Sequence, residues 1–185
     1  MTLDGYWQLI DDARKASSKL VEMPQRLIDS LCKMDEQEIV AFDSYYVDCL
    51  YRAYDAQLWL AAVVIMGGCS DDTFSDFRGW LIARGRARFE SALVDPDSLA
   101  DLDSFDGDDG YPTLFYLGSV TSRAFCKLSA GDEQDFDASM RFEALCPVRK
   151  YPPLERENLI SASDDEARAM FPRLAARFPK GTSHG

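Results

Sequence analysis

The sequence predicts an all-α protein built as a single compact multi-helix domain. Three observations predict it: apolar residues recur every three or four positions, capping residues precede these stretches, and no segment alternates apolar and polar residues as a half-buried strand would. A chain of 185 residues, 46% of them apolar, can bury a core without disulfides or metal. We expect this domain to span residues 1–180, followed by a disordered tail at 181–185.

The first third of the chain predicts three helices. Leu3–Ser17 carries an apolar stripe with helical spacing, and a proline in the first turn opens a short helix over Pro24–Lys33. Asp35 followed three residues later by Glu38 forms a capping-box pattern. This pattern predicts the start of a long amphipathic helix that continues through Tyr54.

The middle of the chain predicts a central buried helix and two further helices. Ala56–Met66 is apolar nearly all round and stops at two glycines, which is typical of a buried helix with a left-handed C-terminal glycine. Its Val63–Ile65 run could instead be a buried strand, but the length of the segment favours a helix. Ser70 or Asp71 then caps the next helix, and Arg86–Val94 forms another.

The last part of the chain predicts two helices between less regular segments. Tyr111–Leu128 has a helical pattern, and a glycine follows that would end it. Ser163 with Glu166 forms a second capping box, which opens a short helix that a proline breaks before the last turn. We expect an acidic, solvated loop near 103–110 and an irregular segment at 132–158.

Charge and composition exclude several functions. The net charge of −12 repels phosphate, so we expect no nucleic-acid partner. The longest apolar run, Leu58–Met66, is less than half of a membrane span and no basic leader opens the chain, so we expect a cytoplasmic protein with no membrane partner. The five cysteines lack Cys-x-x-Cys spacing, and the one histidine is His184 near the end, so we expect no metal site, disulfide framework or cofactor.

A distinctive string lies between Trp59 and Leu102: Gly-Gly-Cys-Ser-Asp-Asp, followed by Phe-x-x-Phe-Arg-x-Trp-Leu-Ile. In this string the chain resembles an uncharacterised bacterial family, domain of unknown function 4240. Tyr6–Asp11, Ala41–Asp43 and the closing Phe171–Phe178 resemble other elements of that family, and 132–158 is the poorest match. The resemblance implies no assigned activity.

The best candidate binding site is the turn before the helix that contains Arg78. Two glycines permit close approach of a ligand to the backbone, and the helix N-terminus offers free N–H groups for a carbonyl, carboxylate or thiolate. The structural alternative is stronger, because capping, helix-dipole and ion-pair roles account for most residues of these types. The candidate binding residues are Trp59, Cys69, Ser70, Asp71, Asp72, Arg78 and Trp80.

Two other chemistries are weaker candidates. Cys69 at a helix N-terminus could have a lowered thiol pKa, but nothing nearby supplies a base. The acidic run from Asp95 to Asp109 suggests calcium, but Phe105 and Pro112 occupy positions where an EF-hand needs oxygen ligands. We therefore expect a solvated acidic loop and buried, unreactive cysteines.

Two functions remain. The favoured one is a non-enzymatic protein-interaction module, immunity-like or a regulatory adaptor, whose acidic face meets another protein, preferably a basic one. The alternative is a small enzyme or small-molecule binder that uses the Cys69–Asp72 turn with Arg78. The favoured interpretation is therefore that the protein is not an enzyme.

Overall fold

The computed structural model describes residues 1–102, 118–146 and 162–179, and within these ranges every regular element is a helix. The predicted all-α class is therefore confirmed. In chain order the elements are α1 (Leu3–Ala16), the 3-10 helix η1 (Leu20–Glu22), α2 (Met23–Leu31), α3 (Glu36–Arg52), α4 (Ala56–Met66), α5 (Asp71–Ala83), α6 (Arg86–Val94), the 3-10 helix η2 (Pro96–Asp101), α7 (Gly118–Ala130), α8 (Phe136–Leu145), α9 (Asp164–Met170) and α10 (Pro172–Arg177).

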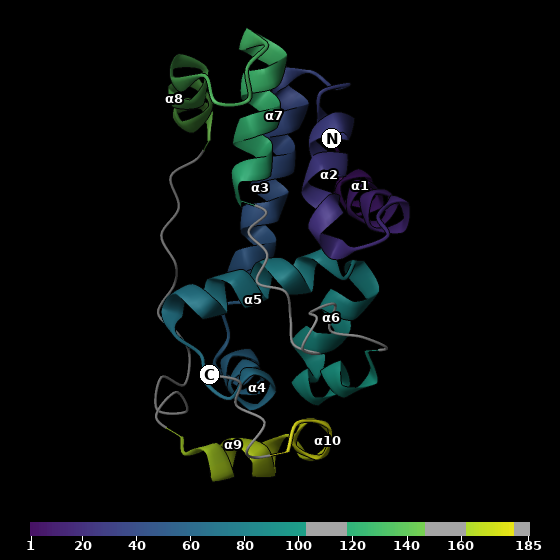
Figure 1. Ribbon diagram of the computed structural model, residues 1–185, viewed down its shortest axis with the longest axis vertical. Coiled ribbons are helices and arrows are strands. Elements are labelled where there is room, and N and C mark those ends of the chain that lie inside the picture. Colours follow the sequence, from purple (N-terminus) through teal and green to yellow (C-terminus); the bar gives the residue numbers. More distant parts are fainter. Residues whose placement is uncertain (103–117, 147–161, 180–185) are drawn as a thin grey trace.

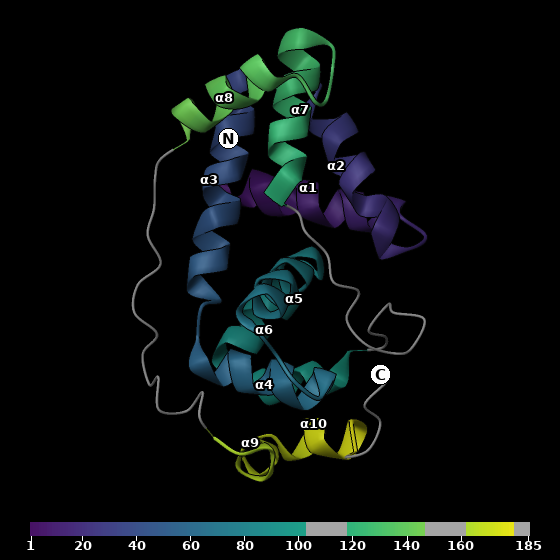
Figure 2. The ribbon, with the colours of Figure 1, turned by 60° about the vertical axis from the view of Figure 1, so that its left-hand side comes forward.

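The helices form two groups that meet around α3 and α5 (Figures 1 and 2). In the first group α7 packs against α2, α3 and α8, and α1 packs against α2 and α3. In the second group α4 packs against α5, α9 and α10, and η2 packs against α6 and α10. Because α5 contacts both α1 and α3, it joins the two groups.

The helix boundaries follow from local signals that the sequence contains. The side chain of Asp35 accepts the N–H of Glu38 at 2.8 Å, so the predicted capping box opens α3. The second predicted box, from Ser163 and Glu166, opens α9. Gly67 ends α4 with φ of 72°, a left-handed conformation that glycine adopts without a steric penalty. The segment that could have been a strand is therefore helical.

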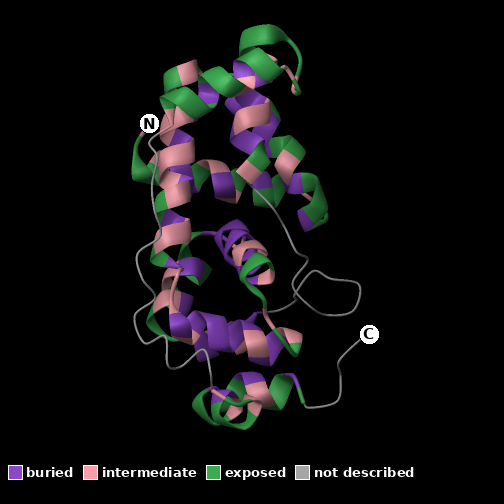
Figure 3. Ribbon diagram, turned by 90° about the vertical axis from the view of Figure 1, so that its left-hand side faces the viewer, coloured by how far each residue is buried: buried purple, intermediate pink, exposed green. Residues whose placement is uncertain are grey.

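One continuous core runs through both groups (Figure 3). Tyr6 and Trp7 on α1 illustrate the connection, because the Tyr6 ring lies 4.8 Å from that of Phe42 on α3 and the Trp7 ring lies 5.3 Å from that of Phe89 on α6. Aromatic side chains supply much of the buried apolar area of such a core. The largest fully buried aromatic side chains are Tyr6, Phe42, Phe74, Phe77, Trp80, Phe89 and Phe125.

The C-terminal helices dock through a buried carboxylate. Asp97 on η2 accepts the backbone N–H groups of Arg173 and Leu174 at 3.1 and 2.9 Å, at the start of α10. A carboxylate suits this place because the first N–H groups of a helix have no intrahelical partner. Arg173 also pairs with Asp101. The Asp-Pro-Asp segment and the closing turn therefore serve to hold two distant parts of the chain together.

The prediction of an irregular segment at 132–158 is wrong for the residues that form α8. Asp135 caps this helix by accepting the N–H of Ala138 at 2.8 Å. Ala138 and Phe142 are buried, and the ring of Phe142 lies 5.3 Å from that of Phe125 on α7. Tertiary packing thus stabilises a helix whose own pattern is too short to reveal it.

Other expectations are met in part. The predicted Tyr111–Leu128 helix is described from Gly118, and it ends before Gly131, whose φ is 77°. The acidic loop near 103–110, the remainder of the irregular segment from 147 and the tail at 181–185 lie outside the described residues. In the parts of the chain that are described, none of the helices combines the length and the apolar character needed to cross a bilayer.

Candidate functional site

The Cys69–Asp72 turn joins α4 to α5, and its residues carry out the local tasks of a helix start. Ser70 is the N-cap of α5: its hydroxyl accepts the N–H of Thr73 at 3.3 Å and shares a 2.8 Å hydrogen bond with the Thr73 hydroxyl. Asp71 and Asp72 occupy the first turn, where carboxylates interact favourably with the helix dipole. Both side chains are exposed, so their charges face solvent.

Cys69 is half-buried, and its thiol is poorly suited to nucleophilic chemistry. Burial and the neighbouring Asp71 carboxylate raise the pKa of the Cys69 thiol to about 12, against a smaller lowering effect from Arg78. A reactive cysteine needs a substantial thiolate fraction at neutral pH. The thiol instead donates a weak hydrogen bond to the carbonyl of Ser70 at 3.6 Å. The helix-terminus effect that could have lowered this pKa is therefore outweighed by burial and by a like charge.

Arg78 lies on α5 with only 3% of its surface exposed. Its Nη1 donates to the carbonyl of Leu50 at 3.0 Å and its Nε donates to the carbonyl of Phe74 at 3.4 Å. Leu50 belongs to the last turn of α3, whose carbonyls lack partners within the helix. The guanidinium also lies 5.0 Å from the ring centres of Tyr54 and Phe74. Arg78 thus closes the end of α3, a contact that the sequence analysis did not anticipate.

The two tryptophans of the candidate set belong to the core. The ring of Trp59 on α4 lies 4.6 Å from that of Phe74, and the ring of Trp80 lies 5.3 Å from that of Phe77. Trp80 is fully buried. It also sits about 13 Å along the α5 axis from the turn, given the 1.5 Å rise per residue of a helix. The structure therefore connects Trp59 to Arg78 through Phe74 and places Trp80 away from the turn.

A polar cluster that the sequence analysis missed lies between α3, α7 and the end of α8. Asp43 on α3 accepts a hydrogen bond from the Thr121 hydroxyl at 2.6 Å. Burial and the Asp43 carboxylate raise the pKa of the Cys146 thiol to about 12. A signal did exist, because Asp43 follows the buried Ile39 by four residues and so lies on the same side of α3, where it is half-buried. The Cys146 thiol is therefore protonated at neutral pH and is a poor nucleophile. The cluster connects α3, α7 and the end of α8.

A second buried pair lies between α1 and α3. The Tyr6 side chain is fully buried beside Cys49. Burial raises the pKa of the Cys49 thiol to about 11, and burial raises the pKa of the Tyr6 phenol well above its ordinary value. Both groups stay protonated at neutral pH. Cys49 and Cys126 are buried as expected, but Cys32, Cys69 and Cys146 are only half-buried, so the expectation of buried cysteines is wrong for these three.

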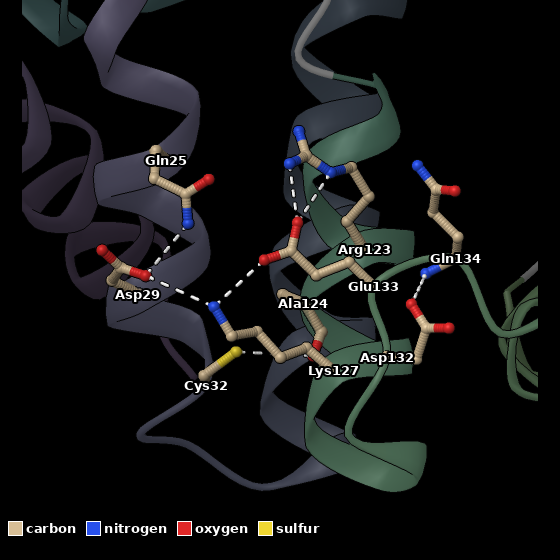
Figure 4. Close-up of polar contacts among 9 residues, drawn as sticks. All are labelled: Gln25, Asp29, Cys32, Arg123, Ala124, Lys127, Asp132, Glu133 and Gln134. Carbon is tan, nitrogen blue, oxygen red and sulfur yellow. Dashed lines mark hydrogen bonds and ion pairs between the residues drawn. The ribbon is translucent and has the colours of Figure 1, made fainter.

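A network of charges fixes the loop between α7 and α8 (Figure 4). Glu133 accepts hydrogen bonds from Arg123 at 2.6 and 3.1 Å and from Lys127 at 3.0 Å. Lys127 also lies 3.7 Å from the Asp29 carboxylate on α2. Lys127 and Arg123 together hold the pKa of Glu133 below its ordinary value. The start of α8 is therefore anchored to both α2 and α7.

The described residues contain no group of three or more His, Cys, Asp or Glu side chains placed to hold a metal ion. Two glycines do precede the turn, and a Cβ added at Gly67 or Gly68 would meet nothing within 4 Å. The turn is thus open to solvent, and the contacts of its side chains are those of a helix cap. A binding role for the seven candidate residues stays a prediction.

Fold and site together define an all-α protein in which the candidate site residues cap helices, join helices or pack in the core. The sequence of the chain was compared with models of known protein families. The chain belongs to the family described as Protein of unknown function (DUF4240), whose model matches residues 1–127. This match covers α1 to η2 and most of α7, but not α8, α9 or α10. No curated protein and no solved structure matches the chain.

Proposed function

We propose that this protein is a non-enzymatic protein-interaction module with an acidic surface, immunity-like or a regulatory adaptor, whose partner is a basic protein in the cytoplasm. The observation that carries the proposal is the way in which the charges are distributed. Acidic and basic residues are equal in number over the first 34 residues, but acidic residues outnumber basic ones by more than two to one between 35 and 102. Of the net charge of −12, −8 therefore comes from residues 35–102, where 13 acidic residues stand against 5 basic ones.

Many basic side chains in the described ranges are already paired with carboxylates. Such pairs neutralise the positive charge locally, and this leaves the remaining carboxylates to set the surface potential. These pairs include Arg52 with Glu90, Arg86 with Asp4, Arg123 and Lys127 with Glu133, Arg141 with Glu36, Arg168 with Asp164, and Arg173 with Asp101.

Other carboxylates have no hydrogen bond or ion pair with a side chain in the described part of the chain. Three of them, Asp71, Asp72 and Asp76, follow one another along the start of α5. Burial and the Asp72 carboxylate raise the pKa of Asp76, so this arrangement works against the charged form. Like charges four residues apart destabilise a helix. A basic partner would relieve this repulsion, which supports an interaction role.

The alternative, a small enzyme or small-molecule binder at Cys69–Asp72 with Arg78, has less support. The Cys69 thiol in this turn has a pKa of about 12, and the Arg78 side chain is nearly fully buried against Leu50 and Phe74. A substrate would have to displace these contacts.

The test is a pull-down from the host cell with quantitative mass spectrometry, followed by association kinetics with the purified protein that is enriched. We expect a basic partner whose association rate falls steeply as salt is added, because screening weakens long-range attraction. A partner that is acidic or neutral, with an association rate independent of salt, would refute the proposal.

Charge variants sharpen this test. Neutralising the α5 group with Asp71→Asn, Asp72→Asn and Asp76→Asn should slow association and flatten its salt dependence. The control neutralises Asp12→Asn and Glu22→Gln, exposed carboxylates in the neutral N-terminal part of the chain. The α5 set removes three charges and the control set removes two, so the effects are compared per charge removed. An equal effect per charge would mean that total charge, and not its location, matters.

A further inference from the structure

The outward face of α8 combines apolar side chains with strong exposure. Phe136 is 74% exposed and Met140 is 50% exposed. These residues are four apart, so they lie next to one another on one face of the helix. Ala138 and Phe142 are buried on the opposite face, where they pack towards α7. The helix thus has one apolar face in the core and a second one in solvent.

Carboxylates border the exposed apolar pair. Asp137 precedes Met140 by three residues and Glu143 follows it by three, so both lie beside it on the helix surface. Both are exposed, and neither has a hydrogen bond or ion pair within the described residues. Arg141, the one basic residue of α8, is held by Glu36 at 3.1 Å and lies over the Phe125 ring. The outer face of α8, defined by Phe136, Asp137, Met140 and Glu143, is therefore apolar and negative.

This face is held in a fixed position. The loop before α8 is fixed by the Glu133 network, and the far part of the helix is fixed by Arg141. Figures 1 and 2 place α8 at one end of the molecule, against α7 and the start of α3. A preformed surface binds more tightly than one that must be ordered first.

We propose that the outer face of α8 is the docking surface for a basic, amphipathic segment of the partner protein. The inference rests on the proposed function and specifies the surface and the chemistry of its occupant. Apolar side chains of that segment would cover Phe136 and Met140, and its Lys or Arg side chains would pair with Asp137 and Glu143. A second copy of the chain fits poorly, because each copy carries −12 and the same carboxylates would face one another.

The carboxylates at the start of α5 do not offer the same combination. Among the described residues, the large apolar side chains that are exposed include three on α8 and none on α5. Central apolar anchors with a charged border are the usual composition of a specific interface. The α5 carboxylates therefore steer the approach of the partner, and α8 holds it. Since α8 lies beyond the residues that match the family model, this surface is additional to the part defined by the family.

The test begins with a photo-cross-linking amino acid placed at position 140 in host cells. The matched control is position 94, because Val94 on α6 is an apolar residue with 88% exposure. We expect position 140 to form an adduct with the same basic protein that the full chain enriches, and position 94 to form none.

Binding of that purified protein then measures the contribution of the surface. Phe136→Ser with Met140→Ser should weaken Kd about tenfold or more, as the loss of a buried apolar anchor does, while the control Val94→Ser leaves Kd unchanged. Asp137→Asn with Glu143→Gln should slow association at low salt and have little effect at high salt. Thermal melts of each variant verify that folding is intact.

Three outcomes would overturn the inference. In the first, a basic partner binds in a salt-dependent way, but the α8 variants bind it as tightly as wild type; the proposed function would then stand without this surface. In the second, position 140 cross-links to another copy of the chain or to an acidic protein. In the third, no basic partner is enriched, and the inference falls together with the proposed function.

Discussion

Replacing Arg78 by alanine should destabilise the fold far more than replacing either aspartate of the adjacent turn. Arg78→Ala removes a side chain that is 3% exposed and leaves the carbonyl of Leu50, at the end of α3, without its 3.0 Å hydrogen bond. The guanidinium also leaves the rings of Tyr54 and Phe74. The perturbation therefore affects the contact between α3 and α5 on which the two helix groups depend.

The magnitude follows from these contacts. A hydrogen bond from a charged donor contributes about 1.5–3 kcal/mol to the free energy of unfolding. A cation above an aromatic ring adds about 1 kcal/mol when it is removed from water. We therefore expect Arg78→Ala to cost about 3 kcal/mol. Ser70→Ala should cost about 1 kcal/mol as a lost cap. Asp71→Ala and Asp72→Ala should cost about 0.3–1 kcal/mol, because each only removes a charge near the helix dipole.

Urea unfolding followed by circular dichroism measures these differences. The control Arg78→Lys keeps the charge but lacks the planar group that reaches two carbonyls, so it should fall between wild type and alanine. If Arg78→Ala unfolds within about 1 kcal/mol of Asp71→Ala at equal m values, the structural role assigned to Arg78 is wrong. If all these variants unfold like wild type yet lose the partner, the turn is a binding site.

Three further predictions test the electrostatics of the fold. Lys127 and Arg123 lower the pKa of Glu133, so the contribution of Glu133 to stability is present near neutral pH and is lost as the pH falls below the ordinary glutamate value of 4.5. Urea unfolding should therefore show a difference in stability between wild type and Glu133→Gln near neutral pH, and this difference should disappear in acid. Because burial and Asp71 raise the pKa of the Cys69 thiol, iodoacetamide should modify Cys69 more slowly than a cysteine in an unfolded chain, and Asp71→Asn should speed the reaction. Mass spectrometry measures the rate of modification, and a rate as fast as that of an unfolded cysteine would contradict this prediction. EDTA should leave the melting temperature unchanged, and a drop of several degrees would reveal a structural metal.

The sequence by itself determined the class of fold and most helix boundaries, because these depend on local interactions. The capping boxes at Asp35 and Ser163 and the left-handed glycine after Met66 act through contacts within four residues along the chain. Such signals can be found in a single sequence. The resemblance at the Cys69–Asp72 turn was equally visible, and the family match confirms it.

Only the tertiary structure decided the roles of the polar residues that join distant helices. The buried carboxylate of Asp97 holds α10 from 76 residues away, and the Asp43 carboxylate accepts from Thr121 across 78 residues. Neither contact can be recognised from the residues that neighbour it in the sequence, because its two partners lie far apart in the chain. The helix α8 was not predicted for the same reason, because it depends on packing of Phe142 against Phe125. The exposed pair Phe136 and Met140 on that helix was therefore not predicted either. Periodicity identifies which residues share a face, but whether a face meets the core or solvent depends on elements elsewhere in the chain.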